Sequence, residues 1–418
     1  MGKLRLSQKE RDRLDVLKKV QAGSLSCRKA AELLGMSYRH TLRVAARYEA
    51  DGGAGLAHRL RDRPSNRKLA PSRREEVLEL YRAKYHDFGP RLASEYLLRD
   101  DAVEIHEETL RRWLIAAGLW KARRHGARHR QWRERRACWG ELVQMDGSEH
   151  DWFEGRRAKA WLMVMIDDAT NWTHAAFFEG ETTVAAMTVF SEYVGYYGLP
   201  RALYVDHDSI YETTRDSTVD EALRDASPLT HFGRAMKTLQ VELILANSPQ
   251  AKGRVERRHG VLQDRLVKAL RLKKISTIEA GNKFLEESFL DELNDRFHVE
   301  ARSPTNVHRK VPRELKLKHV LCQQEQRQVQ NDWTISWRNR ILQLAERHQK
   351  LALARKQIVV SEPLDGTLRL TYQDRELEWR ELPQRPKPAA RKPSKPATHK
   401  APHKPAADHP WHGKKPAG

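Results

Sequence analysis

The stretch AKAWLMVMIDDAT (158–170) contains an unbroken apolar run from Ala160 to Ile166. A run of this length fits a β-strand that is buried on both faces of a sheet covered by helices. It is too short to cross a membrane, and the chain has no run of about 18 apolar residues. The first residues, MGKLRLSQKERDRL, also lack the apolar core of a secretion signal. The stretch therefore predicts a layered core with a central sheet.

The sequence on both sides of this strand continues the same pattern. ELVQMDGSEHDWF (141–153) alternates as a strand does, with Leu142, Gln144 and Asp146 on one side and Val143 and Met145 on the other. Three further strands are expected in WTHAAFFEG (172–180), RALYVDHD (201–208) and VELILANS (241–248). Helices are expected at 183–197, around 231–240 and over 252–272. This order predicts a mixed five-stranded α/β sheet.

Three carboxylates occupy related places in this pattern. Asp146 lies on the first strand, Asp206 ends the fourth, and Glu256 opens the last long helix. Functional sites of open sheets gather at strand carboxyl ends and nearby helix starts. Clustered carboxylates repel each other unless cations neutralise them, and hard oxygen ligands select Mg²⁺ or Mn²⁺. The pattern predicts a site for two such ions, which can activate water or a DNA 3′-hydroxyl.

Other acidic residues compete for these roles. Asp208 lies on the same strand face as Asp206, two residues later, and is an alternative to it. Surface or capping roles remain open for a further set: Glu149, Asp151, Asp167 and Asp168.

Three segments carry a resemblance to a known family: VQMDGSEHDWF (143–153), ALYVDHDSIY (202–211) and NSPQAKGRVERRHGVLQDRL (247–266). Together they resemble the DDE core of bacterial insertion-sequence transposases and retroviral integrases, closest to the ISNCY group, over roughly residues 10–380. The resemblance implies a ribonuclease-H-like fold with Asp146, Asp206 and Glu256 as catalytic residues and metal ligands. The 49 residues between Asp206 and Glu256 exceed the spacing of many members, and a loop insertion within 209–230 accounts for the extra length.

The resemblance also implies the reaction and the partners. The protein would bind double-stranded DNA at the terminal inverted repeats of its element, cleave it and join the ends to target DNA. It would act as a homodimer or larger assembly in the cytoplasm, associated with the nucleoid. Two alternatives stay open: a non-catalytic DNA-binding regulator, and a structure-directed nuclease on the same fold.

The first 60 residues predict a helix-turn-helix domain. Gly35 separates two short helices, and Ser37 can cap the second of them. Leu42, Ala45 and Ala46 are expected to face inward. Outward residues of the second helix would contact DNA: Tyr38, Arg39, His40, Arg43 and Arg47. A small helical packing module is the alternative.

Residues 61–137 predict a second module of the same kind. HEETLRRWLIAAGL (106–119) has a helix start, an apolar face and a glycine stop, and its Arg111 and Arg112 would contact DNA. The basic run 121–136 would either lie along phosphates or form a solvated charged helix. Residues 1–137 hold 33 basic and 18 acidic residues, a net charge of +15, which suits a polyanionic partner.

The remaining segments complete the domain prediction. The catalytic core would span 138–298, and a carboxyl-terminal segment, 299–382, would contain a small β domain for DNA or subunit contacts or for stability alone. The tail, 383–418, holds 9 basic residues and 1 acidic residue and has a composition typical of disorder. Beside Glu256, Lys252, Arg254 and Arg258 are expected to contact phosphates. Cys27, Cys138 and Cys322 are isolated, so no disulfide or zinc framework is expected.

Overall fold

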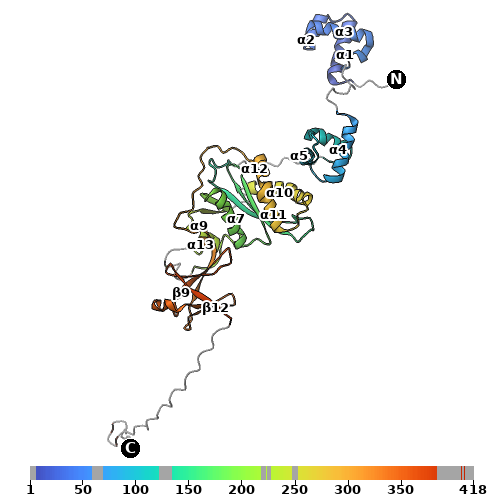
Figure 1. Ribbon diagram of the computed structural model, residues 1–418. Coiled ribbons are helices and arrows are strands. Elements are labelled where there is room, and N and C mark those ends of the chain that lie inside the picture. Colours follow the sequence, from blue (N-terminus) through green and yellow to red (C-terminus); the bar gives the residue numbers. More distant parts are fainter. Residues whose placement is uncertain are drawn as a thin grey trace, which may run out of the picture. The chain divides into compact units, whose positions relative to one another are not determined.

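The computed structural model describes residues 6–58, 69–121, 134–217, 223, 227–246, 253–383, 406 and 409 (Figure 1). Contacts divide the chain into two units, Met1–Arg124 and His125–Gly418. Each unit is described by itself below. The predicted basic run 121–136 lies mostly, and the predicted tail almost entirely, outside the described residues.

The first half of unit one is a three-helix module. Its elements are α1 (Gln8–Gln21), α2 (Cys27–Leu33), α3 (Tyr38–Asp51) and the short 3₁₀ turn η1 (Gly52–Leu56). Ser37 caps α3 by accepting a hydrogen bond from the backbone N–H of His40 at 3.3 Å. The core contains Leu17, Val44 and Leu56. The predicted inward face of α3 is right for Ala45, which packs against this core, and wrong for Leu42, which is 41% exposed, and for Ala46, which is also exposed, because Thr41 and Val44 face the core instead.

The second half of unit one is also helical, with α4 (Pro71–Lys84), α5 (Pro90–Asp101) and α6 (Glu107–Ala116). Tyr85, Phe88 and Tyr96 form a buried aromatic group, and Phe88 and Tyr96 meet edge to face. His106 caps α6, and Gly118 ends it with a positive φ of 70°, as the sequence predicts.

A five-stranded sheet forms the centre of unit two. Its strands are β1 (Val143–His150), β2 (Ala160–Asp167), β3 (Thr173–Phe178), β4 (Ala202–Val205) and β5 (Glu242–Leu245). Their order across the sheet is β3-β2-β1-β4-β5. β2 is antiparallel to both of its neighbours, β1 and β3, whereas β4 is parallel to both β1 and β5. The predicted mixed five-stranded sheet is confirmed.

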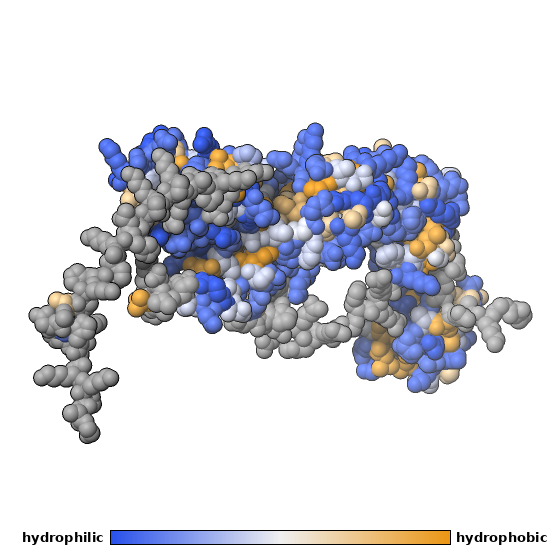
Figure 2. Space-filling view, turned by 90° about the horizontal axis from the view of Figure 1, so that it is seen from below, coloured by the Kyte–Doolittle hydropathy of each residue, from blue (hydrophilic) through white to orange (hydrophobic). Residues whose placement is uncertain are grey.

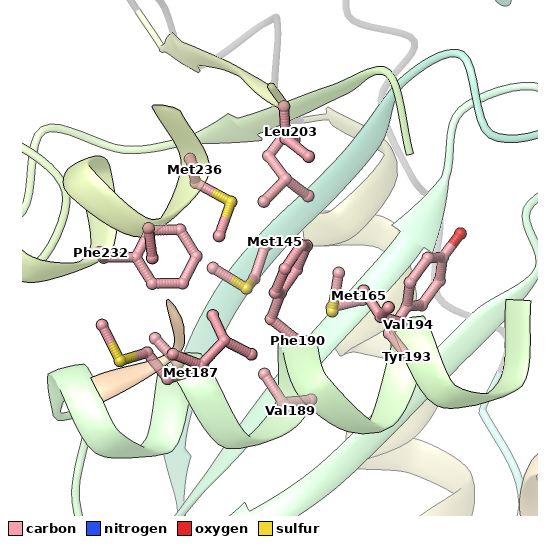
Figure 3. Close-up of a cluster of buried hydrophobic side chains, with 14 of the residues drawn as sticks. Met145, Met165, Met187, Val189, Phe190, Tyr193, Val194, Leu203, Phe232 and Met236 are labelled. Carbon is pink, nitrogen blue, oxygen red and sulfur yellow. The ribbon is translucent and has the colours of Figure 1, made fainter. Parts of the chain in front are cut away.

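Helices cover both faces of this sheet (Figure 1). One face packs against α7 (Thr183–Tyr197) and α9 (His231–Thr238). Figure 3 shows how Met145 of β1 and Leu203 of β4 meet Phe190 of α7 and Met236 of α9 in this layer. The other face packs against α10 (Gly253–Leu272) and a helical segment made of α11 (Ile278–Phe284), a π-helical turn η3 (Leu285–Phe289) and α12 (Leu290–Phe297).

Two asparagine side chains cover the outer edge of β3. Asn294 accepts a hydrogen bond from the Thr173 N–H at 2.8 Å and donates one to the Thr173 carbonyl at 2.9 Å. Asn282 makes the same pair of bonds with Phe177, at 2.6 and 3.0 Å. Each amide therefore replaces the backbone of a neighbouring strand at one residue of this edge.

The carboxyl-terminal part contains the predicted small β domain. It follows α13 (Leu317–Val320). One sheet has the order β11-β10-β9-β6, and the other has the order β12-β8-β7. The strands are β6 (Cys322–Gln328), β7 (Thr334–Trp337), β8 (Arg340–Leu344), β9 (Gln357–Pro363), β10 (Arg369–Tyr372), β11 (Arg375–Leu377) and β12 (Trp379–Leu382). Arg234 of α9 joins this domain to the core by donating to the carbonyls of Val320 and Cys322.

The outer surface shown in Figure 2 is mostly hydrophilic, with hydrophobic residues in small scattered groups. Among the described residues, no helix combines the length and the hydropathy needed to span a membrane.

Candidate active site and nucleic-acid contacts

Asp146 and Asp206 occupy matching positions on neighbouring strands. β1 and β4 run parallel, with Val143 opposite Leu203 and Gln144 opposite Tyr204. Continuing that register by two residues puts Asp146 of β1 beside Asp206, which directly follows β4. Registered residues of parallel strands point to the same face of a sheet. The topology therefore brings these two carboxylates together at the carboxyl end of β4, although they are 60 residues apart in sequence.

A buried tyrosine lies within reach of both carboxylates. The Tyr211 side chain is 5% exposed, and its hydroxyl has no hydrogen-bond partner among the described residues. Burial raises the pKa of Tyr211 well above its usual value. The charges of Glu181, Asp206, Asp146 and Asp208 raise it further. One hydroxyl therefore experiences four carboxylates that come from three separate segments of the core.

Glu181 approaches the site from the segment before α7. Its Oε1 lies only 2.5 Å from where a Cβ on Gly147 would stand, next to Asp146 on β1. Only glycine leaves this room without moving the Glu181 carboxylate. Because successive residues of a strand point to opposite faces, Glu181 approaches β1 from the α7 side, opposite to the Asp146 side chain.

Helix α10 crosses the same face of the sheet as Asp146. The Val255 N–H donates to Gln144 Oε1 at 3.3 Å, and the His259 Nε2 lies 3.4 Å from Asp146 Oδ2. His259 is 8% exposed. Glu256 is exposed and stands one turn before His259, on the same side of the helix. The helix that carries the third predicted carboxylate is thus anchored beside the first one.

The donor chemistry of this region suits a divalent cation. Carboxylate oxygens are the ligands that Mg²⁺ and Mn²⁺ prefer, and Asp146 and Asp206 supply them side by side. Within the described parts of the chain, however, no three His, Cys, Asp or Glu side chains stand close enough together to hold one ion. The register of β1 and β4 aligns two of the three predicted ligands, and Glu256 lies exposed on α10.

The competing carboxylates have local structural partners. Asp208 Oδ1 accepts a hydrogen bond from the Ile210 N–H at 2.8 Å and so closes the turn after β4. Asp151 accepts from the Gly155 N–H at 3.0 Å. Asp167 accepts hydrogen bonds from the Gly140 N–H and the Thr170 N–H. The pKa of Asp167 is raised, mainly because the carboxylate is buried. Glu149 is exposed.

Arg254 and Arg258, expected as phosphate contacts beside Glu256, are both buried. Arg254 Nε lies 2.6 Å from Asp168 Oδ1, and that carboxylate also accepts hydrogen bonds from Gln144 and the Arg136 N–H. Arg258 donates to the Asn171 carbonyl at 3.1 Å. Lys252 lies outside the described residues, so its predicted role is not addressed by the structure.

The basic residues of α3 and α6 differ in their surroundings. On α3, Tyr38, Arg39 and Arg43 are exposed, and His40 and Arg47 are half-buried. On α6, Arg111 and Arg112 both pair with Glu108, at 2.6 and 3.1 Å. These hydrogen bonds lower the pKa of Glu108 to about 2.

Three residues of the site were not expected as members of it from the sequence: Glu181, Tyr211 and His259. Glu181 and Tyr211 lie in loops with no periodic pattern, and His259 reads as an ordinary polar helix residue. Their proximity depends on the sheet topology, which local patterns do not encode. The one available signal is the position of Tyr211 five residues after Asp206 and of His259 three after Glu256.

Comparison with known proteins supports the modular reading. Two family models, both described as a homeodomain-like domain, match residues 7–57 and 41–114. The Sinorhizobium fredii protein y4bF, described as a transposase, is 36% identical over 91% of this chain and 82% of its own length. The transposase for insertion sequence IS1202 of Streptococcus pneumoniae is 25% identical over 88% of this chain and 85% of its own.

Solved structures similar to this chain include the HTLV-2 integrase catalytic core domain in complex with magnesium, in its trimeric form. It is 14% identical, covers 35% of this chain and 82% of that chain, and has a TM-score of 0.27. A score this low carries no structural argument. The identity to y4bF over most of both chains does decide the family. The chain belongs to the insertion-sequence transposases, a family of DNA-binding enzymes, as its motifs predict.

Proposed function

We propose that this transposase uses Asp146, Asp206 and Glu256 as its catalytic carboxylates, in a DDE-type reaction. The observation that carries the proposal is the register of β1 and β4, which sets Asp146 beside Asp206 at a strand end. Glu256 joins them from α10, one turn from the His259–Asp146 contact. The DNA strand at the element end would enter over this edge of the sheet.

Two Mg²⁺ or Mn²⁺ ions held there would supply an activated water or 3′-hydroxyl for hydrolysis and strand transfer. The chain itself orients the ligands. Asp146 lies on β1, Asp206 directly follows β4, and His259 of α10 lies 3.4 Å from Asp146. Tyr211 stays protonated because burial and the neighbouring carboxylates oppose loss of its proton. It is therefore available as a hydrogen-bond donor to these carboxylates.

The helical modules would recognise the terminal inverted repeats, with α3 presenting Tyr38, Arg39, His40, Arg43 and Arg47 to the DNA, and α6 presenting Arg111 and Arg112. The exposure of α3 supports this role. Because two element ends must be processed together, we propose that a homodimer or larger assembly forms on DNA. Such an assembly would act in the cytoplasm on nucleoid DNA.

The test is cleavage of a labelled duplex carrying the ends of the protein's own element, with Mg²⁺. Glu256→Gln removes the charge and keeps the size, and we expect cleavage to fall by at least about 100-fold. Glu149→Gln is the matched control, because Glu149 is exposed on β1 close to the site. We expect this variant to cleave the duplex at the wild-type rate. Normal cleavage by Glu256→Gln would remove Glu256 from the centre. Binding without cleavage by the wild type would favour a regulator, and cleavage without repeat preference would favour a structure-directed nuclease.

A further inference from the structure

A hollow of about 250 Å³ lies on the side of α10 away from Asp146. Four arginines line it: Arg135, Arg254, Arg257 and Arg258. The rest of its lining consists of Ile166, Asn171, Val261 and Phe297. At 100° per residue, the α10 residues of this hollow point roughly opposite to Glu256 and His259. The hollow is therefore separate from the carboxylate pair.

The positive charge of this hollow is only partly balanced by its surroundings. Among the described residues, none that lines it is acidic. Asp168 and Asp167 act on Arg135 from outside the lining, and Asp168 is itself engaged by Arg254 at 2.6 Å and by Gln144 at 3.0 Å. The adjoining sequence segments 122–133 and 247–252 contain neither Asp nor Glu. Arg135 is bonded to neutral groups, among them Asn171 Oδ1 at 2.8 Å.

Arg258 is a buried cation of this hollow with an unused hydrogen-bond donor. Its side chain is 5% exposed, and its Nη1 is buried without a hydrogen-bond partner. Its other contacts are the Asn171 carbonyl and the ring of Phe297, 5.4 Å from the guanidinium carbon. Burial, and then the charge of Arg135, lowers the pKa of Arg258 to about 10. A buried donor without an acceptor and beside like charge is unfavourable unless an anion completes the site.

We propose that this arginine hollow binds one phosphate group of the DNA backbone. Arginine forks match phosphate oxygens in a bidentate way, and four of them converge here from two segments of the core. The bound phosphate would accept a hydrogen bond from Nη1 of Arg258. Its negative charge would also reduce the repulsion between Arg135 and the neighbouring arginines. Because the DNA identity of the ligand rests on the proposed function, binding must be measured separately from cleavage.

The experiment uses the full chain in EDTA, so that failure of the proposed metal chemistry does not affect it. Binding of a labelled duplex of unrelated sequence is measured against salt concentration for the wild type and for Arg257→Ala, whose side chain is exposed and not needed for the core. Loss of one phosphate contact lowers the slope of log K against log salt by about 0.9. Arg313→Ala, an exposed arginine distant in sequence from the hollow, is the control and should keep the wild-type slope.

A second measurement tests the anion site directly. Inorganic phosphate should raise the Tm of the wild type above that in chloride of equal ionic strength, and Arg257→Ala should reduce this gain. Arg135→Gln gives a second variant with the same expectation. Phosphate stabilisation with an unchanged DNA slope in both variants would mean an adventitious ion only and would overturn the proposal. A change of oligomeric mass without a change of slope would overturn it too, by pointing to a carboxylate of a second copy.

Discussion

In the amino-terminal unit, Arg111 pairs with Glu108 three residues away on the same helix. In the core, Arg254 pairs with Asp168, 86 residues away in sequence. The first pair is exposed, and the second is almost completely buried. A local, solvated pair is screened and contributes little, whereas removing one partner of a buried pair leaves an uncompensated charge. Charge in the helical modules is thus available for a partner, whereas the buried Arg254–Asp168 pair in the core stabilises the fold.

The largest effect should come from breaking the buried pair. Arg254→Gln leaves the Asp168 carboxylate without its cation and should lower the free energy of unfolding by about 3–5 kcal/mol. Urea denaturation of the full chain checks this, with Arg112→Gln as the control on the exposed pair. Equal stability of the two variants would break the comparison.

A smaller but specific effect, a loss of DNA cleavage, is expected when one carboxylate of the Asp146–Asp206 pair is replaced. Asp206→Asn should lower cleavage by at least about 100-fold with the fold intact. Asp208→Asn should retain most activity, because Asp208 closes a turn and an asparagine can accept the same Ile210 hydrogen bond. Cleavage rates of the two variants in Mg²⁺ check this. The reverse order would make Asp208 the second ligand.

On DNA, α3 should contribute more than α6. Among the described residues no carboxylate pairs with Arg43, whereas Arg112 shares Glu108 with Arg111. Arg43→Ala should weaken binding to the terminal repeats by about tenfold or more, and Arg112→Ala by less. Fluorescence anisotropy at fixed salt compares them. Equal losses would show that Glu108 releases its arginines to the DNA.

The smallest effect concerns the pH dependence of α6. The hydrogen bonds from Arg111 and Arg112 lower the pKa of Glu108 from 4.5 to about 2. A depressed carboxylate stabilises the folded state above the unfolded value and loses that contribution as the pH falls. The Tm difference between the wild type and Glu108→Gln should therefore be greatest above pH 4.5 and shrink as the pH falls toward 2. A difference that grows with acid would contradict the assignment.

The parts of the molecule that follow local rules could be predicted from the sequence. Ser37, His106 and Gly118 mark helix ends where capping chemistry puts them, and the run 160–166 became a buried strand. The face of α3 was wrong at Leu42 and Ala46, because only the packing of the three helices decides that Thr41 and Val44 face the core.

The candidate site was predictable only in part. The strand order allowed Asp146 and Asp206 to be grouped, and the parallel register of β1 and β4, continued by two residues, is consistent with that grouping. Tyr211 and Glu181 could not be found, because their proximity depends on loops that return to the sheet edge. The burial of Arg254 was missed for a similar reason, since its partner is on the turn after β2.

The two asparagines that bond to the edge of β3, Asn282 of α11 and Asn294 of α12, have a consequence for how copies of this chain associate. An open strand edge is a template for pairing with another sheet, and it favours aggregation. At Thr173 and Phe177 that template is already occupied by side-chain amides, so a second strand cannot add there without displacing Asn294 and Asn282. The proposed assembly on DNA would bring several copies of the chain together. Because these amides occupy the edge of β3, copies of the chain are hindered from associating by uncontrolled strand pairing on this side of the core.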